Sequence, residues 1–175
     1  MDKSYKEIFP QIDTLIFDVD GVLTNGMVTV YPNGEMLRHM NIKDGYALKA
    51  AVKAGLRVCI ISGGTNEGVR KRLENLGLTD IYLGAHNKIN QYNELLEKYN
   101  LKPENILYMG DDIPDVPVMK KVGMPCCPND AVREVQQISA YISDKKGGEG
   151  CARDVIEQVM RVQAKWDGNF DAKYD

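Results

Sequence analysis

The sequence predicts an α/β fold built as a three-layer, doubly wound, Rossmann-like and mostly parallel sheet. Short apolar runs typical of buried strands alternate with longer segments of helical spacing along most of the chain. Several of these runs end in acidic or small polar residues, as expected where strand ends form a ligand-binding edge. The 175 residues, 43% of them hydrophobic, suit a single domain over residues 1–175.

The first elements are the most characteristic. The run at 14–17 (TLIF) ends at Asp18 and is typical of a strand buried on both faces. Residues 27–31 and 35–41 flank a Pro-Asn-Gly turn and predict a hairpin that projects from the sheet. The following elements are expected as helix 44–54, strand 56–61, helix 66–76, strand 81–83, helix 88–99, strand 106–109, helix 131–137, strand 141–142 and helix 152–162.

Two further segments complete the chain. Residues 114–122 lead into 124–127 (MPCC), an apolar run that a proline interrupts. Residues 163–175 form a polar C-terminal tail. Capping residues and glycines mark the ends of several helices, as with Gly55 and Gly77.

Composition excludes several classes of function. With 22 basic and 25 acidic side chains and a pI near 5.5, the chain has no surplus of positive charge for a nucleic acid. Its apolar runs are far shorter than the ~20 residues of a membrane span, and its start lacks a signal peptide's apolar middle. We therefore expect no membrane contact and a cytoplasmic protein. Four cysteines without C-x-x-C spacing and two scattered histidines predict reduced thiols and a metal bound by oxygen alone.

Acidic and small polar residues follow the predicted strands where their carboxyl ends should meet. They are Asp18 and Asp20 after the first strand, Ser62 and Gly63 after the second, and Asp111, Asp112 and Asp115 after the strand at 106–109. So many carboxylates at one edge would repel one another unless a divalent cation balanced them. Mg²⁺ fits best because it is a hard cation that prefers oxygen.

These residues suit phosphoryl transfer. Asp18 is the natural nucleophile, and Asp20, two residues on in an extended chain, would protonate the leaving alcohol and later activate water. Ser62 with its backbone, and Lys88 at a helix start, would bind phosphate oxygens, and Asp111 would bind the metal. Alone, Ser62 equally suits a helix cap and Lys88 an exposed helix position, and we expect Asp112 and Asp115 to support the metal site.

The sequence resembles the haloacid-dehalogenase superfamily of phosphotransferases. The resemblance rests on DVDG at 18–21, Ser62, Lys88 and GDDIPD at 110–115, and it spans nearly the whole chain. It implies a phosphoaspartyl intermediate on Asp18 and magnesium held by Asp18, the Asp20 carbonyl and Asp111. The short gaps between the motifs leave no room for the cap domain that most members carry, so the chain is expected to be capless.

More narrowly, the sequence looks like the family of 3-deoxy-D-manno-octulosonate 8-phosphate phosphatases. DVDGVLTNG, NIKDGYALK, GDDIPDVPVM and KKGGEGCARDVIE carry this resemblance. It implies a homotetramer in which the hairpin at 27–41 builds the subunit interface and neighbouring subunits, with their C-terminal tails, complete the pocket. It also implies a product destined for lipopolysaccharide. An ordinary surface hairpin and a frayed tail are the competing interpretation.

The residues that would recognise the sugar acid are less well defined. Arg70 and Arg72 follow Ser62 and suit a carboxylate, although helix arginines are commonly solvated. Lys146 belongs to a basic, glycine-rich segment that could fold over an anionic substrate, or form a plain surface turn. Gly64 stands where phosphatases of the nine-carbon 2-keto-3-deoxynononate 9-phosphate carry glutamate, which argues against that substrate without supporting the eight-carbon one.

The expected function is Mg²⁺-dependent hydrolysis of a sugar-acid phosphate, with 3-deoxy-D-manno-octulosonate 8-phosphate as the favoured substrate. The alternatives are 2-keto-3-deoxynononate 9-phosphate hydrolysis and a non-catalytic tetramerisation module of the kind fused to nucleotide-sugar synthetases. A two-component receiver domain is disfavoured, because its phosphoacceptor aspartate follows the third strand, whereas here the D-x-D follows the first.

Overall fold

The computed structural model, which describes residues 4–166, has a six-stranded sheet at its centre. The strands run in the order β5-β4-β1-β6-β7-β8, and every neighbouring pair is parallel. Their bounds are β1 Thr14–Phe17, β4 Arg57–Ile61, β5 Asp80–Tyr82, β6 Ile106–Met109, β7 Met124–Cys127 and β8 Tyr141–Ile142. The predicted α/β fold is confirmed.

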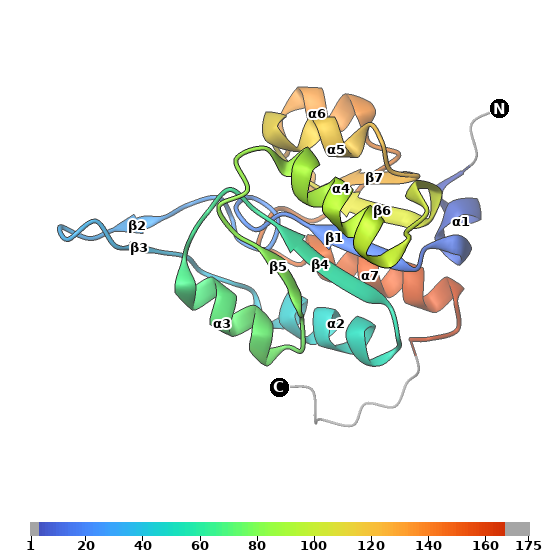
Figure 1. Cartoon of the computed structure of the whole chain (residues 1–175), viewed down its shortest axis with the longest axis horizontal. Helices are drawn as coiled ribbons and strands as arrows, with labels where there is room; N and C mark the ends of the chain where they lie inside the picture. The colour runs from blue at the N-terminus through green and yellow to red at the C-terminus, as the bar shows by residue number, and fades with distance from the viewer. Residues whose placement is uncertain (1–3, 167–175) are drawn as a thin grey trace.

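Helices cover both faces of the sheet and make the three layers (Figure 1). One layer holds α2 Ile42–Lys53, α3 Glu67–Asn75 and α7 Cys151–Val162; the other holds α4 Lys88–Tyr99, α5 Val116–Met119 and α6 Arg133–Ile138. Alternation along β1 sends Leu15 and Phe17 into the core under α2 and α7, and Ile16 into the core under α4. Both sides of the strand are buried, which explains why its sequence is continuously apolar.

Several boundaries differ from the sequence prediction for local reasons. Helix α2 begins at Ile42, before the acidic residue taken as its start, because the Asn41 side chain caps it by accepting the Lys43 N–H at 2.8 Å. Asp44 is therefore inside the helix, where it is buried and accepts the Arg153 N–H of α7 at 2.7 Å. The chain also starts with a short helix, α1 Tyr5–Ile8, and a 3₁₀ turn, Phe9–Gln11, which the pattern did not predict.

The proline-interrupted run at 124–127 is strand β7. In a parallel strand the N–H and C=O of one residue face the same neighbour. The Pro125 carbonyl accepts the Ala140 N–H at 2.8 Å, so the missing proline N–H faces the short strand β8. Because β8 has only two residues, the ladder tolerates the absent donor.

The hairpin of β2 Thr29–Val30 and β3 Met36–Leu37 projects from the molecule, as predicted (Figure 1). Its base is tied to α3, because the Asn66 side chain donates to the Met36 carbonyl at 2.8 Å. Between Gly21 and Ser62 the chain holds this hairpin, α2 and β4, so no cap domain is inserted there.

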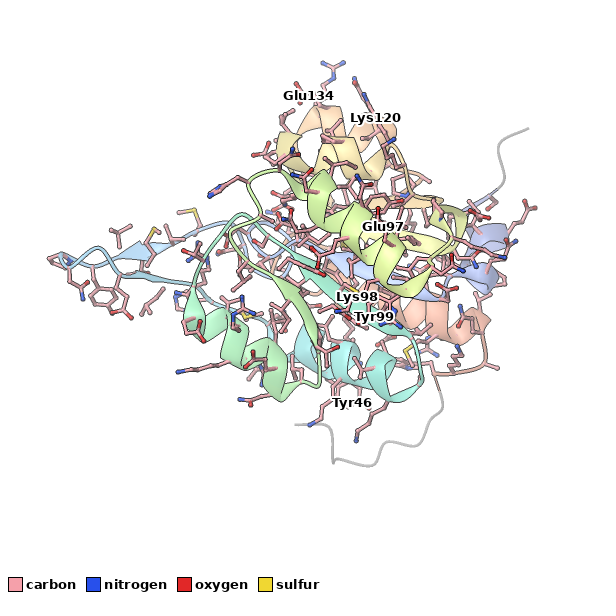
Figure 2. All side chains as sticks on the ribbon, viewed as in Figure 1. Tyr46, Glu97, Lys98, Tyr99, Lys120 and Glu134 are labelled. Carbon is pink, nitrogen blue, oxygen red and sulfur yellow. The ribbon has the colours of Figure 1, made fainter. Side chains whose placement is uncertain are left out.

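The end of the sheet opposite the strand carboxyl ends is fixed by an ion cluster around the buried carboxylate of Asp80. Lys98 and Tyr99, which close α4 and are labelled in Figure 2, both contact the first residue of β5. The Lys98 ammonium lies 2.9 Å and the Tyr99 hydroxyl 3.0 Å from Asp80. This cluster anchors the edge strand away from the candidate site. No helix within residues 4–166 has the length and apolar character needed to cross a membrane.

Candidate active site

The site lies where the strand order reverses, at the carboxyl end of the sheet. Strand β1 pairs with β4 on one side and β6 on the other, and a pocket of about 420 Å³ opens beyond these strand ends. Eight positions singled out from the sequence line this pocket: Asp18, Asp20, Ser62, Gly63, Lys88, Asp111, Asp112 and Asp115. The structure thus brings together the groups predicted to bind metal and transfer phosphate.

Lys88 links two of the carboxylates. It is the first residue of α4 and is buried, with its ammonium 2.8 Å from Asp18 Oδ2 and 2.7 Å from Asp115 Oδ1. Burial lowers the pKa of Lys88, but the charges of Asp18 and Asp115 outweigh it and hold the pKa above its ordinary value. A fixed positive charge therefore lies beside the predicted nucleophile.

Asp115 holds the other groups in place. Its Oδ1 also accepts the Tyr108 hydroxyl at 2.6 Å, and its Oδ2 accepts the backbone N–H groups of Asp111 at 3.1 Å and Asp112 at 3.3 Å. Both oxygens are thus engaged by protein donors. Tyr108, on β6, was missed by the sequence reasoning, since a tyrosine in a buried strand gives no signal of a polar partner.

Three carboxylates crowd together in the pocket. Oxygens of Asp18, Asp111 and Asp115 lie within 4.8 Å of one another. Burial, together with the charge of Asp115, raises the pKa of Asp18 to about 6 against the opposing effect of Lys88. Burial and the charges of Asp18 and Asp115 raise the pKa of Asp111 to about 8. One ammonium does not balance this much negative charge.

The free oxygens fit a divalent cation. Asp111 Oδ1 is buried and makes no hydrogen bond, although an unpaired buried oxygen is costly. Asp111 Oδ1 is therefore the unpaired ligand, whereas Asp18 accepts the Val19 N–H at Oδ1 and contacts Lys88 at Oδ2, so it would share an oxygen between these partners and a metal. Anionic oxygens held this close are the donor set that Mg²⁺ prefers.

Gly21 lets the loop after β1 return past the metal ligands. Its φ is +91°, and a Cβ there would lie 2.0 Å from Asp111 Oδ2. Only glycine fits both the backbone conformation and the space. The glycine of the D-x-D-G motif is thus required by close approach as well as by the turn.

Asp20 is held by an arginine that the sequence reasoning missed. Arg38 Nε lies 2.6 Å from Asp20 Oδ1, and Arg38 Nη2 lies 3.0 Å from Asp20 Oδ2. The hydrogen bonds that Arg38 donates to Asp20 raise the pKa of Arg38, and burial opposes them. Arg38 follows β3 of the hairpin, and nothing in a single sequence links that position to the first strand.

Ser62 closes the pocket beside β4. It is buried, and its backbone is fixed on both sides, donating to the Tyr82 carbonyl and accepting the Ala85 N–H, each at 2.9 Å. Its Oγ accepts the Gly64 N–H at 3.4 Å. The hydroxyl is thus held at the pocket by two neighbouring loops.

The three residues predicted to bind the sugar acid lie elsewhere in this chain. Within residues 4–166, Arg70, Arg72 and Lys146 are not among the pocket-lining residues. Arg70 donates to the Ile81 carbonyl at 3.2 Å, and the Arg72 guanidinium lies against Gly45 of α2. Their binding role stays a prediction.

The chain is similar in sequence and in fold to known proteins. Residues 41–123 match the haloacid dehalogenase-like hydrolase family model. The chain is 39% identical over 156 residues to 3-deoxy-D-manno-octulosonate 8-phosphate phosphatase of Escherichia coli (strain K12), covering 89% of this chain and 83% of that protein.

Solved structures are similar over nearly the whole fold. The 3-deoxy-D-manno-octulosonate 8-phosphate phosphatase of Yersinia pestis superposes with a TM-score of 0.92 at 33% identity, covering 96% of this chain and 91% of that one. The Moraxella catarrhalis phosphatase, in complex with magnesium ion, phosphate ion and KDO, gives a TM-score of 0.89 at 27% identity, covering 93% of each chain.

Proposed function

Because the chain belongs to the 3-deoxy-D-manno-octulosonate 8-phosphate phosphatase family of haloacid dehalogenase-like hydrolases, we propose that it hydrolyses this sugar-acid phosphate to KDO and phosphate. The observation that carries the proposal is the convergence of Asp18, Lys88 and Asp111 at the carboxyl edge of the sheet. The product would then serve lipopolysaccharide biosynthesis. The cytoplasmic location expected from the sequence stays a prediction.

Two displacements at phosphorus would complete the reaction. A carboxylate oxygen of Asp18 attacks phosphorus and forms an acyl phosphate, while the bond from phosphorus to the sugar oxygen breaks and Asp20 supplies the proton to that oxygen. Water then attacks the phosphorus, gives its proton to Asp20, and releases Asp18 and phosphate. Lys88 stabilises the charge of Asp18 and of the transferring group, and Ser62 with Gly63 binds phosphate oxygens.

Mg²⁺ would be held by Asp18, the Asp20 carbonyl and Asp111. The unpaired Asp111 Oδ1 and the raised pKa values of Asp18 and Asp111 support this ligand set. When bound, the ion neutralises the phosphoryl charge that otherwise repels an anionic nucleophile. Asp112 and Asp115 support the site, Asp115 by fixing Lys88 and the backbone of Asp111.

The working form would be a homotetramer assembled through the hairpin at 27–41. Seven of the ten exposed large apolar side chains among residues 4–166 lie on or beside this hairpin: Met27, Val28, Val30, Tyr31, Met36, Leu37 and Ile42. Contiguous exposed apolar surface of this kind marks a protein contact. The tail at 163–175, of which residues 167–175 lie outside the described residues, would reach a neighbouring pocket. Sedimentation analysis tests the subunit count.

Phosphate release from a panel of sugar phosphates tests the function. We expect kcat/KM for the eight-carbon acid phosphate to exceed that for hexose phosphates by orders of magnitude, and activity to disappear with a chelator and return with Mg²⁺. A preference for 2-keto-3-deoxynononate 9-phosphate would replace the substrate. Absence of release from every ester would favour the assembly module and reject the proposal.

The variant Asp18→Asn tests the nucleophile. It is close in shape but cannot form the acyl phosphate, so turnover should fall by at least about a thousandfold. Circular dichroism and the thermal midpoint should show an intact fold. Full activity in this variant would exclude Asp18 as the nucleophile.

A further inference from the structure

We infer that Arg38, carried by the projecting hairpin, is the positioning residue that aims the Asp20 carboxylate at the reacting oxygen. The inference rests on the proposed function, because it assigns a role in the same reaction. The hairpin would then serve the proton transfer step as well as subunit contact.

The contact itself is a fork on a carboxylate. Both oxygens of Asp20 accept from one guanidinium, at 2.6 Å and 3.0 Å, and this two-point geometry fixes the carboxylate plane as a single hydrogen bond does not. The Arg38 side chain is 7% exposed, whereas the Asp20 side chain is 34% exposed. The pair is thus sheltered on the arginine side and open on the aspartate side.

Arg38 contacts Asp20 on the side away from the reaction pocket. Asp20 lines the reaction pocket, whereas Arg38, among the described residues, lines a small adjoining space with Val19 and Leu83. The guanidinium therefore acts on the substrate through Asp20. This placement distinguishes a positioning residue from one that binds phosphate directly.

The arginine is itself held by neighbouring structure. Arg38 Nη1 and the Asn66 amide both donate to the Met36 carbonyl, at 3.4 Å and 2.8 Å. Asn66 also caps α3 by accepting the Val69 N–H at 2.9 Å. The start of α3, the base of the hairpin and the aspartate are thus connected by hydrogen bonds.

Gly64 leaves the space that the pair occupies. A Cβ at this position would lie 3.1 Å from Asp20 Oδ2 and 3.2 Å from Arg38 Nη2. These approaches are closer than ordinary van der Waals contact, so a Cβ there would push the pair by a few tenths of an ångström. The absence of a side chain at Gly64 thus leaves room for Arg38 beside Asp20.

The positioning role predicts an effect that depends on the leaving group. A sugar alkoxide needs a proton as it departs, whereas nitrophenolate is stable as an anion and needs little help. Since kcat/KM reports the steps through loss of the leaving group, a misplaced Asp20 should slow the sugar ester far more than p-nitrophenyl phosphate. General loss of structure would slow both substrates alike.

The test compares Arg38→Met, Arg38→Lys and Asp20→Asn on these two substrates with saturating Mg²⁺. For Arg38→Met we expect kcat/KM to fall at least about 100-fold on the sugar-acid phosphate and less than about 10-fold on p-nitrophenyl phosphate, parallel to Asp20→Asn. Arg38→Lys should recover part of the loss. Arg161→Met is the matched control, because it removes an exposed arginine paired with Glu157 far from the pocket, and both rates should stay unchanged.

Equal losses on the two substrates, or no loss on either, would overturn the inference while leaving the phosphatase assignment in place. If the wild-type protein releases no phosphate from either ester, both the proposed function and this inference are wrong. Sedimentation of each variant separates loss of assembly from loss of positioning. Should Arg38→Met not fold, Arg38→Gln removes the guanidinium fork while keeping a polar side chain and should show the same leaving-group dependence, and its absence there counts equally against the inference.

Discussion

Asp115 shows how one residue can order a reactive site without performing chemistry. It carries one charge, yet it receives an ammonium, a phenol and two backbone N–H groups, and it is completely buried. The Asp111 backbone, and with it the unpaired Asp111 oxygen, is placed by this carboxylate. Removing one partner of a buried charge network leaves the rest uncompensated.

Replacing Asp115 with Asn should therefore destabilise the protein and the site together. Whichever oxygen the amide NH₂ replaces, it would face groups that are themselves hydrogen-bond donors. We therefore expect the unfolding free energy to fall by about 3 kcal/mol and kcat to fall at least tenfold. Urea denaturation and phosphate release measure the two effects. Asp112→Asn, at an exposed capping residue, should change the unfolding free energy by less than about 1 kcal/mol.

At the scale of elements, α2 and α7 are joined by a buried carboxylate. Asp44 lies within α2 and accepts the Arg153 N–H in the first turn of α7, while its Oδ2 has no hydrogen-bond partner. Burial raises the pKa of Asp44 to about 6, in spite of the backbone N–H groups that lower it. The folded protein therefore binds a proton here more tightly than the unfolded chain does.

This difference gives a pH dependence of defined sign. A folded pKa above the unfolded value contributes stability at low pH that is lost as pH rises from about 4 to about 6. The unfolding free energy of Asp44→Asn relative to wild type should thus shift in favour of the variant by about 3 kcal/mol between pH 4 and pH 7. Chemical denaturation at several pH values measures this shift. A difference that stays constant with pH would contradict the raised pKa.

The sequence predicted elements well where periodicity and capping decide them. Helix 88–99 and strand 106–109 have the observed bounds, because the helix has clear amphipathic spacing and the strand is uniformly buried. It did not predict that MPCC is a strand, since tolerance of Pro125 depends on how short β8 is. The hairpin strands are shorter than expected, two residues each.

The candidate site likewise has residues that the sequence predicted and residues that it did not. The aspartates that follow strands were found because parallel strands end at one edge, which the topology guarantees. Arg38 and Tyr108 were missed, since each contacts its partner through tertiary structure that local pattern does not encode. A pattern in sequence indicates the candidate reacting groups, and the folded chain shows which residues contact them.

At the scale of the whole molecule, the hairpin is the most unusual surface. It projects from the sheet (Figure 1). Both of its strands expose apolar side chains, with Val30 paired opposite Met36. Val30 is 65% exposed, which costs free energy unless another surface covers it. This exposure supports the proposed assembly.

The double variant Val30→Thr with Met36→Thr should weaken the tetramer. Threonine keeps strand propensity and pairs well across a hairpin, so the loss is confined to apolar contact. We expect the dissociation constant to rise at least tenfold by sedimentation. Ile142→Thr removes a comparably exposed residue elsewhere and should leave the subunit count unchanged. An unchanged assembly in the double variant would place the interface on another surface.

The short outer strands of the central sheet have a consequence for aggregation. Strand β8 has two residues and β5 has three, and β5 is held by the ion cluster at Asp80. Strands this short offer few unpaired N–H and C=O groups to the sheet of another molecule. Open-ended stacking of copies of this chain through the edges of the central sheet is therefore disfavoured.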